Sequence, residues 1–156
     1  MNEMNETLRL KLIVEAVRYC QRVKRMGMPP SCYTKALREP VYFLWTRRGG
    51  GPKDELARYR SKSSRRVKRG KGQLLLDHAI PFKYFQSELL NLRDVTPEAV
   101  KNVLAKEVLV LITSSENRQL NASGLGAEMP PAWDGSDVLA RYKAVGIELV
   151  DNPKAQ

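Results

Sequence analysis

One stretch constrains the fold of this chain more than any other, because it joins a strand to a helix with no loop between them. The segment EVLVLIT, residues 107–113, has the β-branched and leucine-rich composition that is typical of a buried strand. Thr113 stands three residues before Glu116, which is the spacing of a capping box. In that motif the two side chains bind backbone N–H groups left free at a helix start, so we expect a helix to begin directly after the strand.

A second apolar run lies upstream and contains the only histidine of the chain. The segment GQLLLDHAI, residues 72–80, predicts a buried strand that ends near Asp77 and His78. If this strand pairs antiparallel with residues 107–113, the Asp-His pair lies beside the first turns of the following helix. That helix offers three polar side chains: Glu116, Asn117 and Asn121.

The adjacent Asp77 and His78 allow two interpretations. In a protein core, an aspartate and a histidine can serve simply as a hydrogen-bonding pair. At a catalytic site, the carboxylate would be a ligand of a divalent cation, and a neutral imidazole would accept a proton as a general base. The two residues alone leave both interpretations open.

The N-terminal region predicts helices. From Glu6 to Arg25, apolar residues recur at helical spacing with basic residues on the other face, and Gly27 ends the pattern. A second helix is expected from Ser31, with a bend or break at Pro40. Short helices are also expected between the two strands, and another from about Ser136 to Ala144.

These elements indicate an α+β class with four parts. We expect a helical region at residues 1–50, a basic glycine-rich arm at 51–72, a ββα core at 73–125, and a C-terminal turn and helix at 126–156 that pack on the core. No apolar run reaches the roughly 18 residues that a membrane-spanning helix needs. The charged N-terminus lacks the pattern of a secretory signal, so we expect a cytoplasmic protein without membrane contact.

The charge of the chain indicates a polyanionic partner. Its 27 lysines and arginines exceed its 17 acidic residues by +10. Between Arg58 and Lys71 there are eight basic residues and no acidic one, which favours contact with phosphates, although a solvated charged face is the alternative. The residues that we expect to contact phosphates are Arg65, Arg66, Lys68, Arg69, Lys71 and Arg118.

Two motifs together resemble a known nuclease family. DHAIP at residues 77–81, followed by VLITSSENR at 110–118, resembles the HNH, or ββα-metal, endonucleases, and in particular the HNH module of RNA-guided CRISPR effector nucleases. The resemblance implies that Asp77 and Asn117 bind one Mg²⁺ or Mn²⁺ ion and that His78 is the general base. Asn121 and then Glu116 are the alternative ligands. The substrate it implies is DNA, cleaved by hydrolysis of phosphodiester bonds.

The chain departs from this family in three respects. Cys20 and Cys32 do not have the spacing of a zinc site, so the cysteine pairs that brace many HNH domains are absent and no zinc is expected. The connection between the two strands, about 27 residues, is longer than in the minimal motif. The middle asparagine of the family name is not found at Glu107 or Val108.

The sequence is also compatible with two other functions. A nucleic-acid-binding protein with the same fold and no catalysis would use the same basic residues. An RNA-cleaving toxin nuclease would use the same metal site. A homodimer through the first helix is an alternative to the packing of that helix on its own domain.

Overall fold

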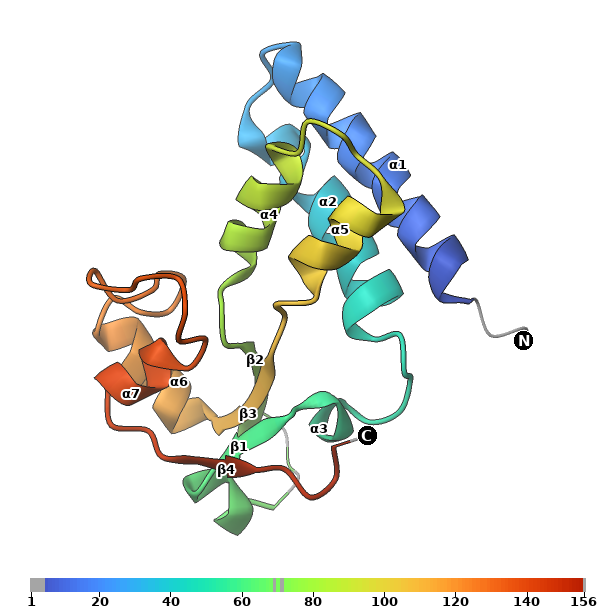
Figure 1. The fold of residues 1–156 in the computed structure, drawn as a ribbon. Coiled ribbons are helices and arrows are strands. Elements are labelled where there is room, and N and C mark those ends of the chain that lie inside the picture. The colour runs from blue at the N-terminus through green and yellow to red at the C-terminus, as the bar shows by residue number, and fades with distance from the viewer. Residues whose placement is uncertain (1–4, 69, 71, 156) are drawn as a thin grey trace. The chain divides into compact units, whose positions relative to one another are not determined.

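The computed structural model describes residues 5–68, 70 and 72–155, and it divides the α+β chain into two units. A helical unit falls within residues 1–50 and 82–106, and a unit built on a sheet falls within residues 51–81 and 107–156 (Figure 1). The connection between the two expected strands therefore belongs with the N-terminal helices. This division differs from the continuous core at 73–125 that the sequence indicates.

Helix α1 (Glu6–Arg25) has the bounds that its periodicity predicts. Asn5 caps it, because the asparagine side chain accepts a hydrogen bond from the Leu8 N–H at 2.8 Å. Helix α1 contacts α2 (Thr34–Val41), α4 (Phe82–Leu90) and α5 (Pro97–Leu104). Among the described residues, none of the helices combines the length and the apolar character that spanning a bilayer requires.

The bend expected at Pro40 is a change of helix type. A short 3₁₀ helix at Pro30–Cys32 precedes α2, and α2 continues through Pro40 into a π-helical turn at Tyr42–Thr46. Proline has no N–H for the helical ladder, which favours such a local change. Trp45 of this turn is buried, and its Nε1 donates to the Leu104 carbonyl at 3.2 Å.

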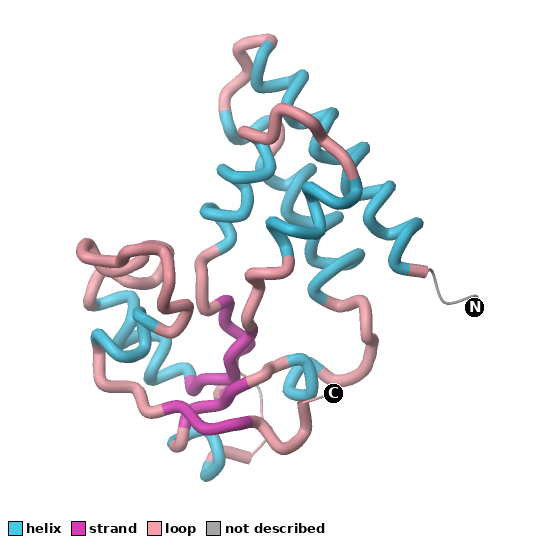
Figure 2. The backbone as a smooth tube through the Cα atoms, in the orientation of Figure 1, coloured by secondary structure: helices cyan, strands magenta, loops and turns pink. Residues whose placement is uncertain are grey.

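The sheet has four strands in the order β2-β3-β1-β4 (Figure 1, Figure 2). Their bounds are β1 Tyr59–Ser61, β2 Leu74–His78, β3 Leu109–Thr113 and β4 Leu149–Asp151. The antiparallel pairing expected of β2 and β3 is confirmed, with Asp77 opposite Val110 and His78 opposite Leu109. β1 is parallel to β3 and antiparallel to β4. β2 is therefore an edge strand of this sheet, and the Asp-His pair lies at its end.

Helix α6 (Ser114–Ala122) begins directly after β3, as the capping box predicts. The Thr113 hydroxyl accepts from the Glu116 N–H at 3.1 Å, and the Glu116 carboxylate accepts from the Thr113 N–H at 2.9 Å. α6 contacts both β2 and β3. The core of the sheet unit is formed by Ala79, Val110, Ile112, Leu120, Leu125, Tyr142 and Ile147.

Part of the segment expected to be an arm is an internal strand. β1 lies within residues 51–72 and is paired on both sides, by β3 and β4. α3 (Lys53–Leu56) precedes it, and a 3₁₀ helix at Ser63–Arg66 follows. Arg60 of β1 donates to the Ser64 hydroxyl at 3.0 Å and to the Ser64 carbonyl at 2.9 Å. The guanidinium of Arg60 therefore stabilises local structure.

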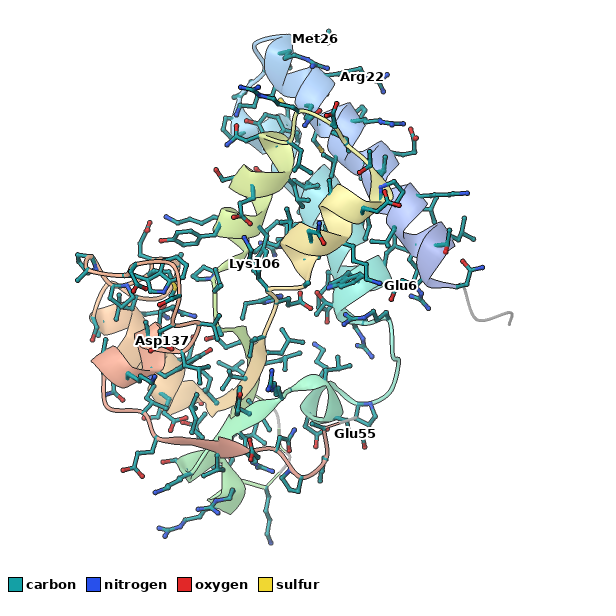
Figure 3. The ribbon with its side chains drawn as sticks, viewed as in Figure 1. Glu6, Arg22, Met26, Glu55, Lys106 and Asp137 are labelled. Atoms are coloured by element: carbon teal, nitrogen blue, oxygen red, sulfur yellow. The ribbon has the colours of Figure 1, made fainter. Side chains whose placement is uncertain are left out.

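The C-terminal helix, α7 (Ala140–Ala144), is shorter than expected. Asp134 accepts a hydrogen bond from the Ser136 N–H at 2.9 Å. Asp137, which lies just before α7 (Figure 3), accepts one from the Leu139 N–H at 3.0 Å. Short polar side chains that bind nearby backbone in this way compete with the helix, so the helix begins only after them.

Replacing Thr113 by alanine tests the capping box. We expect Thr113→Ala to lower the free energy of unfolding by about 1 kcal/mol, since loss of an N-cap hydroxyl typically costs about 0.5–2 kcal/mol. Urea denaturation followed by circular dichroism measures the change. Ser115→Ala, an exposed position in the first turn of the same helix, is the control and should change stability by less than about 0.5 kcal/mol. Equal effects of the two substitutions would contradict the capping role.

Candidate functional site

The site lies at the end of β2, where two residues of α7 hold Asp77. Arg141 Nη1 donates to Asp77 Oδ2 at 3.0 Å, and the Tyr142 hydroxyl donates to the same oxygen at 2.7 Å. The side chain of Arg141 is 1% exposed and that of Asp77 is 19% exposed. The ion pair is therefore largely removed from water, and losing either partner would leave an uncompensated charge in the interior.

Arg141 also connects the end of β2 to the loop that follows α6. Its Nη1 donates to the His78 carbonyl at 2.7 Å. Its Nε and Nη2 donate to the carbonyls of Leu125 and Gly126 at 2.7 Å and 3.1 Å. The rigid fork of donors on a guanidinium suits such a set of acceptors, which a lysine could not reach from one position.

Tyr142 is a neutral donor to the Asp77 carboxylate. Burial raises the pKa of the Tyr142 phenol well above its ordinary value of about 10, and the negative charge of Asp77 raises it further. The hydroxyl thus keeps its proton throughout the neutral range and remains available to Asp77.

The second carboxylate oxygen of Asp77 is open. Both bonds described above end on Oδ2, and no residue in the described part of the chain bonds Oδ1. Every buried side-chain oxygen there has a partner, so Oδ1 must be in contact with solvent. A carboxylate with one oxygen anchored and the other open is a suitable single-oxygen ligand for a hard cation.

His78 points to the opposite face of β2, because successive side chains of a strand alternate. Its Nε2 lies 3.3 Å from Oε2 of Glu107, the residue two positions before the start of β3. The side chain of His78 is 26% exposed and that of Glu107 is 8% exposed. Asp77 and His78 therefore do not form a hydrogen-bonding pair with each other: Asp77 bonds Arg141 and Tyr142 of α7, and His78 contacts Glu107 just before β3.

Helix α6 lies on the Asp77 side of the hairpin. Its residue Leu120 is buried in the core with Val110, the residue that pairs with Asp77 across the strands. Asn117 lies one turn before Leu120, so the two share one side of the helix, and Asn117 is half-buried. The structure thus places Asp77 and Asn117 on the same side of the hairpin, with His78 on the other side.

The two alternative ligands have structural contacts. Glu116 completes the capping box, and Asn121 is exposed with its side chain packed on the loop at Gly126. A Cβ built on Gly126 would lie 2.0 Å from Asn121 Oδ1. Within the described residues, no three His, Cys, Asp or Glu side chains form a group that could hold a metal ion. An ion bound at Asp77 would therefore take few ligands from the carboxylate, imidazole or thiol groups of the described residues.

The exposed basic residues are distributed over both units. Arg65, Arg66, Lys68 and Arg118 are exposed, whereas Arg69 and Lys71 lie outside the described residues. The helical unit carries 14 lysines and arginines against seven acidic residues, so it holds +7 of the net charge of +10. The positive surface is thus not confined to the run at residues 58–71.

Three residues of the site are not indicated by the sequence: Arg141, Tyr142 and Glu107. Arg141 is 64 positions from Asp77, and no spacing pattern links them. The position of Glu107 beside His78 could be predicted once the register of the strand pair is given. In an antiparallel hairpin with His78 opposite Leu109, the residue two positions before Leu109 shares the face of His78.

Comparison of this chain with protein-family models, with curated proteins and with solved structures finds no match. Its function is therefore inferred from the geometry and chemistry of the site.

Removing Arg141 tests its role in the sheet unit. Arg141→Ala should lower the free energy of unfolding by about 3–5 kcal/mol, which is typical when one partner of a buried ion pair is lost. Lys143→Ala is a matched control on the same helix, because Lys143 forms an ion pair with Asp137 while 66% exposed. It should cost about 0–1 kcal/mol. If urea denaturation gives similar values for both variants, Arg141 does not have this role.

Proposed function

We propose that this protein is a divalent-metal-dependent endonuclease that hydrolyses phosphodiester bonds of DNA. The observation that carries the proposal is the ββα arrangement at the end of β2. An antiparallel strand pair passes directly into a capped helix, Asp77 and Asn117 lie on one side of the pair, and a partly exposed His78 ends the first strand. The strand pair and the capped helix agree with the resemblance to HNH endonucleases. The expectation that His78 lies beside α6 together with Asp77 does not hold, because side chains alternate along β2 and His78 lies on the other side of the pair.

His78 is the general base in this proposal. A neutral imidazole accepts a proton from water near neutral pH, and such catalysis contributes on the order of 10²- to 10⁴-fold to a rate. The side chain is exposed enough to meet a water molecule and is restrained by Glu107. The water that loses its proton attacks phosphorus, and the bond to the leaving oxygen breaks. No other histidine in the chain can take over this role.

Asp77 and Asn117 would hold the metal ion. Carboxylate and amide oxygens suit Mg²⁺ or Mn²⁺, and Mg²⁺ usually keeps several water ligands and takes few from the protein. The open Oδ1 of Asp77 fits such a role, since Arg141 and Tyr142 fix the other oxygen in place. When bound, the ion would neutralise charge on the scissile phosphate and stabilise the leaving oxygen.

Exposed basic residues would hold the DNA backbone. Arg65, Arg66 and Lys68 follow β1, and Arg118 is adjacent to Asn117 on α6. Contacts of lysine and arginine with phosphates position a duplex without reading its bases. The excess charge of the helical unit supports a polyanion as the partner of the whole chain.

A second candidate is a nucleic-acid-binding protein without catalysis. The bonds from Arg141 and Tyr142 to Asp77 favour it, because they give the aspartate a structural role that needs no metal. The two candidates differ in what they require: the nuclease needs a divalent ion and His78, whereas the binding protein needs neither.

Nicking of supercoiled plasmid DNA tests the nuclease directly. The parent protein should nick with Mg²⁺ or Mn²⁺ and stop when EDTA is added. His78→Ala should slow nicking by about 10²- to 10⁴-fold. Asn117→Ala should raise the metal concentration needed for half-maximal rate, and Ser115→Ala, on the exposed side of the same helix, should not.

Two results would overturn this assignment to DNA cleavage. Equal nicking by the parent and by His78→Ala would show that His78 is not the base. DNA binding without nicking in the presence of either metal would support the second candidate, a nucleic-acid-binding protein without catalysis. RNA offered beside the plasmid distinguishes a nuclease that prefers RNA.

The dependence of DNA binding on salt tests the basic residues after β1. Changing Arg65, Arg66 and Lys68 together to alanine should flatten the slope of log K against log salt by about 0.9 for each phosphate that these side chains neutralise, or about 3 in total. Lys154→Ala is the control, because Lys154 already pairs with Asp54. An unchanged slope in the triple variant would show that these side chains do not bind phosphates.

A further inference from the structure

We propose that Glu107 is a positioning residue: it holds His78 in the tautomer that carries its proton on Nε2, and so makes Nδ1 the atom that accepts a proton. The catalytic consequence rests on the proposed function. The tautomer does not, because it follows from the contact between the two side chains.

The strand register brings these two side chains together. His78 lies directly opposite Leu109 in the antiparallel pair. Glu107 is two residues before Leu109, and side chains two apart on a strand share a face. The ladder continues past the end of β2, since the Ala79 N–H donates to the Val108 carbonyl at 2.8 Å. The backbone that carries Glu107 is therefore fixed beside His78 by regular pairing.

Hydrogen-bond chemistry assigns the proton in this contact. Nε2 of His78 lies 3.3 Å from Oε2 of Glu107. An ionised carboxylate can only accept hydrogen bonds, so the nitrogen that faces it must be the donor. A neutral imidazole has one N–H, and the other nitrogen is then an acceptor. Pairing with Glu107 therefore leaves Nδ1 with the lone pair.

The burial of Glu107 strengthens this preference. Its side chain is only 8% exposed, and a buried carboxylate depends on hydrogen-bond donors to offset lost hydration. If His78 turned its unprotonated nitrogen toward Glu107, two lone pairs would face each other in a site with little water. The alternative tautomer is thus disfavoured by the surroundings of Glu107 as well as by the geometry.

Nδ1 is free to act as a base. Within the described residues it has no hydrogen-bond partner, and the His78 side chain is 26% exposed. Because every buried side-chain nitrogen there has a partner, Nδ1 must be in contact with solvent. Glu107 therefore restrains one side of the ring and leaves the other side open to a water molecule.

Nitrogen NMR of the protein labelled with ¹⁵N-histidine tests the tautomer without any substrate. The chain has one histidine, so both imidazole signals belong to His78. At a pH where the ring is neutral, the parent should show the proton on Nε2 and an unprotonated Nδ1. Glu107→Gln can donate as well as accept, so it should lose the single tautomer and populate the Nδ1–H form.

The control and the parent spectrum make the test decisive. Glu148→Gln removes another carboxylate of the sheet unit, which is 68% exposed and pairs with Lys62, and it should leave the His78 signals unchanged. A parent proton on Nδ1, or identical spectra for Glu107→Gln and the parent, would overturn the proposal. The parent spectrum needs no variant, so the test stands even if Glu107→Gln does not fold.

Nicking kinetics then test the catalytic consequence separately. Loss of the hydrogen-bond partner that orients a metal-bound histidine typically costs on the order of 10- to 100-fold in activity, and we expect a similar cost for a histidine that acts as a base. Glu107→Gln should lower kcat by this amount with little change in KM, while Glu148→Gln keeps the parent rate. A changed tautomer with an unchanged kcat would mean that Nδ1 is not the base, and an inactive parent would count against the nuclease without altering the tautomer result.

Discussion

The sheet unit depends on one buried guanidinium. Arg141 is 1% exposed, and an arginine in that position is costly unless its donors are all used. Here the donors reach the Asp77 carboxylate and the carbonyls of His78, Leu125 and Gly126. These acceptors lie at the end of β2 and in the loop after α6, while the arginine itself lies on α7. None of the three segments can shift without breaking bonds to a charge that water does not reach.

The same interaction determines what Asp77 can do. A carboxylate has two oxygens, and Arg141 and Tyr142 both bond Oδ2. A structural role and a ligand role therefore do not compete for the same atom. The anchor also fixes the orientation of the open oxygen, which the proposed metal site would require because it supplies few ligands to an ion. The capping box fixes where α6 starts relative to β3, and with it the position of Asn117, the other proposed ligand.

Several helices and strands could be predicted from local sequence patterns. Contacts between residues far apart in the sequence could not, because no pattern in a single sequence links them. The bounds of α1, the strand pair β2 and β3, and the start of α6 follow from periodicity and from one capping motif. β1 was not predicted because its three residues, Tyr59–Ser61, are too few to show the alternation of a strand, and its partners are far away in sequence. Asp77 and His78 were found by motif, whereas Arg141 is tied to them only by the folded structure.

The chain crosses from the sheet unit to the helical unit and back, so the two units do not match the continuous core at residues 73–125 that the sequence indicates. Along the chain, α4 and α5 lie between β2 and β3. These two helices bury Phe85, Leu89 and Val100 in the helical unit. A fragment of residues 73–125 would contain β2, β3 and α6 together with α4 and α5, but without α1 and α2. It would therefore expose apolar faces that α1 and α2 cover in the intact chain. In this protein, β2 and β3 are therefore separated in sequence by a segment that belongs to a different core.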